Sequence, residues 1–177
     1  IAAIENRSHN QYYNDKVGFF GFFDSIDDID VARALLDAAE KDLKLRGLSS
    51  LRGPYSPTVN DECGLLVEGF DSIPFILMPY NPPYYLNLYE KLGLQKVRDL
   101  HAFYVSRSSP MPEKLLRIVE RFKKTTKITV RNIDMKNLNA DLKIIQGLYN
   151  DTLKRNWGFI PLSLEDLEFA AGDLKAF

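Results

Sequence analysis

The run YNPPYYLNLYEKLGL, residues 80–94, carries the strongest structural signal in this chain. Its two prolines fix an extended approach and also suit the first turn of a helix. An aromatic-rich helix is expected to follow, and Gly93 is expected to end it in a left-handed conformation. The apolar pattern of residues 96–106 then predicts a strand. The stretch therefore predicts a helix, a turn and a strand in succession.

A buried strand and a long helix are predicted upstream of this run. Residues 17–23 are apolar throughout, as in a strand buried on both faces. The two glycines of that strand indicate tight packing, with close approach of a ligand as the alternative. Apolar side chains recur at helical spacing through residues 27–46, and Gly47 closes the helix. Ser25 with Asp28 matches a capping box at its start.

Shorter elements are predicted on either side of these two. Residues 1–6 and residues 48–55 each predict a strand, whereas residues 9–15 are polar and predict a turn. Residues 56–78 are long and apolar for a loop, so they are expected to pack against the core. The order is strand, strand, long helix, strand, short helix, strand.

The motif LYEKLGL, residues 88–94, resembles a signature of the GNAT superfamily of acyl-CoA N-acyltransferases. The element order of residues 1–106 resembles the second half of that fold. The spaced run GP…NDE.GLL..GF…P…YNPPYY is similar to runs in uncharacterised bacterial GNAT-like proteins. The resemblance implies an α/β fold with a mixed, mostly antiparallel sheet flanked by helices.

The charge changes sign along the chain, which indicates two modules. Residues 1–105 hold 10 Lys/Arg against 15 Asp/Glu, and residues 106–177 hold 13 against 9. Residues 1–106 are expected to form the C-terminal part of one GNAT-like module, followed by a linker and helix over residues 107–126. Residues 127–177 predict a strand and two helices, which is how a second GNAT module would begin.

A basic run overlaps the linker helix and the start of the second module. The apolar side of that helix falls on residues 115, 116, 119 and 122. A solvated face is the simpler explanation of the basic run, because no aromatic or base-reading motif accompanies it. Contact with phosphate is the alternative. The basic residues are Arg117, Arg121, Lys123, Lys124, Lys127 and Arg131.

The resemblance also implies where a coenzyme would bind. The tyrosine of the GNAT signature often protonates the leaving thiolate, so Tyr89 is the candidate general acid; a buried structural tyrosine is the alternative. Acetyl-CoA or another acyl-CoA is the expected co-substrate. The residues expected to border it are Phe22, Phe23, Ser25 and Tyr85.

The loop that would hold the coenzyme pyrophosphate departs from the family pattern. Residues 24–30 contain four aspartates and no glycine. Two like charges ~5 Å apart repel by ~3 kcal/mol at an effective dielectric of ~20. Coenzyme A binding at this loop is therefore expected to be weak.

Two residues are candidates for binding the acceptor, which is expected to be a small-molecule or peptide amine. His9 has a side chain suited to accept a proton near neutral pH, and Glu5 and Glu68 are the other candidate bases. An exposed surface histidine is the alternative interpretation of His9. Trp157 lies where the resemblance implies an acceptor pocket, with a core plug as the alternative. Cys63 follows two carboxylates, which would raise its thiol pKa, so it is interpreted as structural. No metal-ligand spacing is present.

Composition bounds the remaining expectations. The net charge of −1 gives no bias toward nucleic acid, and no apolar run approaches the ~20 residues of a membrane helix, so neither partner is expected. One cysteine suits a reducing compartment, and a cytoplasmic location follows. A homodimer is one expected assembly. The leading hypothesis is a GNAT-like N-acyltransferase; the alternatives are a non-catalytic GNAT-fold binding module and acyl transfer from another donor such as an aminoacyl-tRNA.

Overall fold

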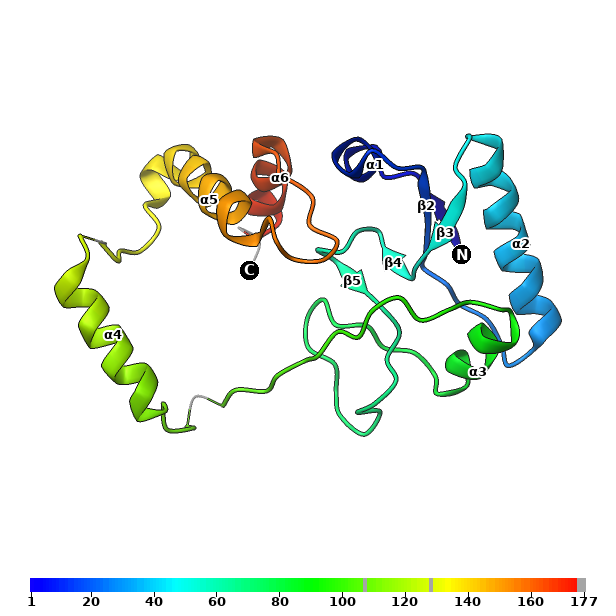
Figure 1. Cartoon of the computed structure of the whole chain (residues 1–177), viewed down its shortest axis with the longest axis horizontal. Helices are drawn as coiled ribbons and strands as arrows, with labels where there is room; N and C mark the ends of the chain where they lie inside the picture. The colour runs from blue at the N-terminus through cyan, green and yellow to red at the C-terminus, as the bar shows by residue number, and fades with distance from the viewer. Residues whose placement is uncertain (107, 128, 175–177) are drawn as a thin grey trace. The chain divides into compact units, whose positions relative to one another are not determined.

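The computed structural model describes residues 1–106, 108–127 and 129–174 and separates them into two compact units (Figure 1). The first unit comprises Ile1–Asp99 with Leu148–Ser163, and the second comprises Leu100–Gly147 with Leu164–Phe177. Helices and short strands both occur, so the predicted α/β class is confirmed. None of the helices in the described ranges is long and apolar enough to cross a membrane.

The first unit is built around a three-stranded sheet. Its central strand β2 (Val17–Gly21) pairs antiparallel with β1 (Ala2–Ile4) and parallel with β3 (Ser50–Arg52). All five residues of β2 are buried, as its continuous apolar sequence predicts. A separate antiparallel pair follows, made of β4 (Tyr55–Ser56) and β5 (Glu62–Cys63).

Three helices accompany this sheet. The long helix α2 (Ile29–Leu45) buries Ala32, Leu36, Ala39 and Leu43, which confirms the predicted helix and its apolar face. The signature run forms α3 (Tyr84–Lys91). Both helices are followed by a glycine with φ +82°, Gly47 and Gly93, as predicted. The third helix, α1 (Arg7–Tyr13), replaces the turn that the polar sequence predicted, so that prediction is wrong.

Neighbouring phenylalanines of β2 point to opposite faces of the sheet, because side chains alternate along a strand. Phe19 belongs to a buried cluster with Val17 and Tyr55. Phe20 belongs to a different cluster with Leu36 and Tyr89. The sheet therefore has a Phe19 face and a Phe20 face, each with its own core.

Glycines allow the chain to close tightly at the end of this sheet. A Cβ atom on Gly21 would lie 1.5 Å from the carbonyl oxygen of Tyr55, and one on Gly53 would lie 2.3 Å from the carbonyl oxygen of Phe20. Real Cβ atoms do not approach backbone that closely, so these positions accept only glycine without a shift. Tight packing thus accounts for Gly21, the second glycine of the strand over residues 17–23.

Two further predictions about the first 106 residues differ from the structure, one of them only in part. Residues 96–106 form no strand, although their apolar side chains are suitably spaced. The prediction that residues 56–78 pack against the core holds for their first part, where Val59, Cys63 and Leu65 pack on the buried clusters. It fails for the apolar residues 73–77, of which Ile76 is 93% exposed. An apolar pattern supplies the side chains of a strand or a packed loop, but the neighbour that would cover them must come from elsewhere in the fold.

The second unit contains helices and a short 3-10 turn. They are α4 (Glu113–Thr125), η1 (Met135–Asn137), α5 (Leu138–Leu153), whose last residues belong to the first unit, and α6 (Leu164–Leu174). The strand expected over residues 127–133 does not form at residues 127 and 129–133, and Ile128 lies outside the described residues. Arg131 instead donates from Nη1 to Oδ2 of the buried Asp141 at 2.7 Å.

Candidate functional site

A hollow of about 420 Å³ opens on the Phe19 face of the first unit. Helix α1 supplies one wall, β3 supplies Arg52, and the turn after α5 supplies the other wall. Three cationic side chains and one carboxylate line it, so it is electropositive. The lining residues are His9, Tyr12, Tyr13, Asp15, Arg52, Lys154, Arg155, Asn156, Trp157 and Gly158.

Three asparagines hold α1 in place. The side chain of Asn6 caps the helix by accepting from the His9 N–H at 2.9 Å, and Asn14 ends it in the left-handed region at φ 52°. The Asn10 amide bonds both backbone groups of Val17, at 3.0 and 3.1 Å. These contacts fix the helix against the end of β2 and aim His9 into the sheet.

His9 is 2% exposed, so its interpretation as a surface histidine is wrong. Its ring lies 4.5 Å from the Tyr13 ring and 4.9 Å from the Phe19 ring. Nε2 lies 3.4 Å from Oδ2 of Asp15 without the alignment of a hydrogen bond, and this buried nitrogen has no hydrogen-bond partner among the described residues. Burial lowers the imidazole pKa below 6.5 despite the opposing effect of Asp15, so His9 is neutral near pH 7.

The opposite wall comes from residues far along the chain. The Arg52 guanidinium lies 5.7 Å from the centre of the Trp157 ring, a cation–π contact. Trp157 also packs against the Phe19 cluster, so it is at once a core residue and a lining residue. The Tyr13 hydroxyl donates to the Phe159 carbonyl at 2.9 Å, which joins α1 to this turn. His9 and Trp157, the two expected acceptor residues, thus line one hollow.

Two further polar groups lie in the Phe19 cluster. Within the part of the chain that the structure describes, the buried Tyr55 hydroxyl has no hydrogen-bond partner, and its ring stacks on Phe19 at 4.9 Å. Burial raises the pKa of the neighbouring Cys63 thiol to about 11. A protonated thiol is a poor nucleophile, which agrees with the structural interpretation of Cys63.

The residues expected to border a coenzyme gather mostly on the other face. Tyr85 donates to Oδ1 of Asp24 at 2.9 Å and accepts from the Ser25 N–H at 3.0 Å. The Phe23 ring lies edge-on to both Tyr85 and Tyr89, at 5.3 and 5.2 Å. This tyrosine cluster, Phe23, Ser25, Tyr85 and Tyr89, ties the end of β2 to α3.

Tyr89 and Phe22 differ from the rest of that set in exposure. Tyr89 is buried beside Phe20 and Leu36, and this burial raises its pKa. Phe22 is 58% exposed and has a positive φ of 48°, with its N–H donating to Oγ of Ser56 at 3.0 Å. Phe22 therefore marks an exposed backbone kink immediately after β2.

The start of α2 is closed by its own cap. Asp28, rather than Ser25, is the capping residue, and its Oδ1 accepts from the N–H groups of Asp30 at 2.8 Å and Val31 at 3.2 Å. The predicted capping box of Ser25 with Asp28 is therefore wrong, and a single side-chain cap by Asp28 stands in its place. The N–H donors that could hold a pyrophosphate are occupied by a carboxylate, and three more aspartates, Asp24, Asp27 and Asp30, lie in the same stretch.

The two predicted sets of site residues lie on opposite faces of β2. His9 contacts Phe19, whereas Tyr89 contacts Phe20. A base that takes the proton from the amine nitrogen and an acid that protonates the leaving sulfur must both reach atoms bonded to one carbonyl carbon. His9 and Tyr89 can share a reaction only if the substrates pass around the end of the sheet.

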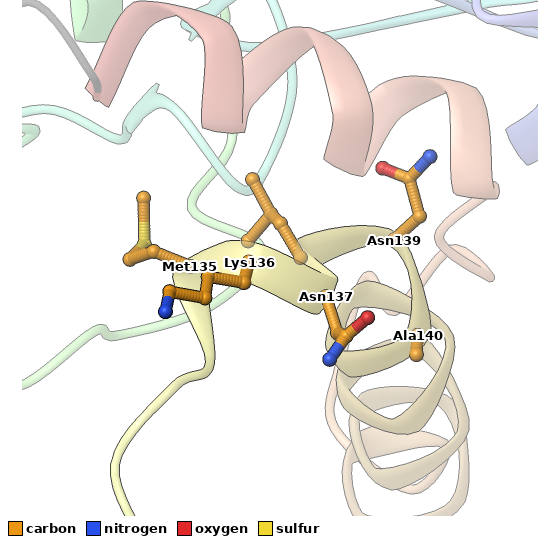
Figure 2. A pocket seen from close by; sticks show the side chains of 6 residues that line it. Met135, Lys136, Asn137, Asn139 and Ala140 are labelled. Atoms are coloured by element: carbon orange, nitrogen blue, oxygen red, sulfur yellow. The ribbon is translucent and has the colours of Figure 1, made fainter.

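A second hollow, of about 310 Å³, lies in the second unit along Met135–Ala140 (Figure 2). Figure 2 shows the side chains of Met135, Lys136, Asn137 and Asn139 pointing in different directions around the turn. A site needs convergent polar groups, so this hollow does not qualify. Among the described residues there is also no group of three His, Cys, Asp or Glu side chains that could hold a metal ion.

The chain is similar to two curated bacterial proteins. It is 36% identical to Protein YghO of Escherichia coli (strain K12) over 179 residues, which cover 99% of this chain and 45% of that protein. It is 34% identical to the Bacterial ceramide synthase of Caulobacter vibrioides (strain NA1000 / CB15N) over 158 residues, which cover 89% of this chain and 41% of that protein. The chain thus spans less than half the length of these relatives. No family model and no solved structure matches, so the GNAT resemblance stays an expectation from motifs.

Proposed function

We propose that this chain forms part of an enzyme that transfers an acyl group from a thioester to the nitrogen of a long-chain amine. The observation that carries the proposal is the 34% identity to the Bacterial ceramide synthase over 89% of the chain. A ceramide is a long-chain amino alcohol with a fatty acyl group on its nitrogen, so a ceramide synthase forms an amide. The LYEKLGL motif supports the same reaction class through its GNAT resemblance.

The hollow around His9 is the proposed site for the amine, which would bind there as the neutral free base, because Arg52, Lys154 and Arg155 disfavour a further cation. The amine nitrogen attacks the thioester carbonyl, a C–N bond forms, and the C–S bond breaks. The nitrogen loses one proton and the departing thiolate gains one, so the step balances. His9 is suited to take the first proton because it lines the hollow and its imidazole is neutral there. Tyr12 and Trp157 offer apolar surface beside it for the attached chain.

Acetyl-CoA and longer acyl-CoAs are the first donors to consider. Because Asp28 already accepts from the N–H groups at the start of α2, the pyrophosphate of such a donor would need another site. The tyrosine cluster remains a proposed border of the acyl thioester, with Tyr89 as the group that returns a proton to sulfur. That role requires the thioester to reach the Phe20 face.

The test is a turnover assay with the full-length protein, acyl-CoAs of several lengths and a long-chain amino alcohol, with the amide product detected by mass. His9→Asn should lower kcat by ~10²–10⁴-fold, the usual contribution of a positioned base. The matched control is His101→Asn, which changes the exposed second histidine and should leave kcat unchanged.

The Tyr89→Phe variant tests on which face of β2 the reaction takes place. If it abolishes turnover while His9→Asn retains it, the reaction takes place on the Phe20 face and the assignment of the hollow is wrong. If the wild-type protein makes no amide from any of these donors, the non-catalytic binding module becomes the better explanation of the fold.

A further inference from the structure

Helix α4 exposes an unusually large apolar surface. Every residue of Glu113–Thr125 is described, and none is buried. Its five large apolar side chains are each 39–53% exposed: Leu115, Leu116, Ile118, Val119 and Phe122. A helix that served only as a soluble connector would have polar residues in these positions.

The apolar and basic side chains of α4 lie on different sides. Leu115, Ile118, Val119 and Phe122 follow one another at spacings of three and four residues, which places them on a single stripe. The basic residues Arg117, Arg121 and Lys124 lie on the side away from the stripe, and Lys114 and Lys123 lie near its two edges. Five cations against Glu113 and Glu120 give the helix a net charge of +3.

We propose that α4 binds the surface of an anionic lipid bilayer, lying in the plane of the interface with its apolar stripe among the acyl chains. An amphipathic helix with lysine and arginine on its polar side matches both the hydrocarbon and the negative headgroups of such a surface. A nucleic acid would match the charge but leave the five apolar side chains without a function. Lipid is therefore the partner that accounts for both sides of the helix.

Membrane binding by α4 does not depend on the proposed acyl transfer. It also revises the expectation that no membrane partner exists, which rested on the absence of a spanning segment. A helix of 13 residues is far shorter than the ~20 needed to cross a bilayer. An interfacial helix needs only one apolar stripe, so the absence of a crossing helix does not oppose this role.

The test is sedimentation of the full-length protein with vesicles of phosphatidylcholine alone or mixed with phosphatidylglycerol. Binding is expected with the mixed vesicles and should weaken as salt is added, because salt screens the headgroup charge. Lys123→Gln with Lys124→Gln should weaken binding about 25-fold, since each surface cation contributes about five-fold. Leu115→Glu with Phe122→Glu should abolish it.

The matched control is Lys41→Gln with Lys91→Gln, which removes the same charge from exposed positions of α2 and α3 and should leave binding unchanged. Because α4 has no buried side chain, its variants should keep the thermal unfolding of the wild type. Hydrogen exchange gives a second readout that needs no variant, since α4 amides should slow when mixed vesicles are added.

Three results would overturn the proposal. One is a wild-type protein that stays in solution with both kinds of vesicle. Another is an apolar-side variant that binds as tightly as the wild type, which would mean that α4 attracts polyanions through charge alone. The third is α4 exchange that is slow without lipid and unchanged by it, because the stripe would then be covered by protein.

Discussion

Replacing Gly21 by alanine should destabilise the first unit through a steric conflict at the end of β2. The new Cβ would lie 1.5 Å from the Tyr55 carbonyl oxygen, whereas non-bonded heavy atoms sit ~3.5 Å apart. Tyr55 must therefore retreat by about 2 Å, which separates its ring from Phe19, now stacked at 4.9 Å. Overpacking of this kind costs ~1–3 kcal/mol, and a conflict with backbone belongs at the upper end.

Chemical denaturation measures this loss as a lower midpoint with an unchanged slope. The matched control is Gly147→Ala within α5, where a new Cβ meets nothing within 4 Å. That change should stabilise by ~0.5–1 kcal/mol, because alanine restricts the unfolded chain and favours helix. A loss below ~0.5 kcal/mol for Gly21→Ala would refute the reasoning, since it would mean that β2 and Tyr55 separate at little cost.

Three further predictions concern the cores and two ionisable groups. Leu36→Ala should cost ~2–5 kcal/mol in the same denaturation experiment, because Leu36 is buried between α2 and β2; a loss below ~1 kcal/mol would contradict that packing. Because burial holds the His9 pKa below 6.5, the unfolded state gains its proton first as pH falls, so stability should decline below about pH 6.5 and His9→Asn should flatten this decline. The hydrogen bond from Arg131 lowers the Asp141 pKa to about 2, so this pair should stabilise the fold above pH 4, and the stabilisation should be lost as pH falls toward 2. Hydrogen exchange of α5 across that range measures the loss, and the Asp141→Asn variant should not show it.

The elements that sequence predicted well are those whose signals are local. The long helix α2 has apolar residues at every turn and a glycine after its end, and α3 has the same arrangement on a smaller scale. The strand β2 is apolar at all five positions, which only burial on both faces explains. Each of these patterns is complete within its own segment, so no distant residue was needed to interpret it.

The helix that carries His9 was missed because its residues are polar and its burial comes from outside. The capping signals were nonetheless present, with Asn6 at the start and Asn14 in a left-handed conformation at the end. Asparagine is favoured at both positions, so the spacing of these two residues could have indicated a seven-residue helix. The burial of His9 depends on Phe19 and Tyr13 together, which no local pattern reveals.

The prediction of a strand over residues 96–106 was wrong for the opposite reason. Its local pattern was adequate, but a strand is stable only when a neighbouring strand accepts its backbone hydrogen bonds. Sequence placed Tyr89 and His9 as a possible acid and base without revealing that they contact opposite faces of β2. That separation follows because the side chains of Phe19 and Phe20 alternate along β2. The alternation can be inferred from the sequence, but the faces that His9 and Tyr89 contact are known only once α1 and α3 are located.

The hydrogen bond between Tyr13 and Phe159 has a consequence for the order of synthesis. Its two residues stand 146 positions apart, so α1 leaves the ribosome long before the turn that completes the hollow. At ordinary elongation rates that interval is roughly 7–30 s. During that interval Phe159 and Trp157 do not yet pack against Tyr12 and the Phe19 face, so the nascent chain exposes an aromatic surface. Ribosome-bound chains halted before residue 148 should therefore recruit chaperones more strongly than chains extended beyond residue 163.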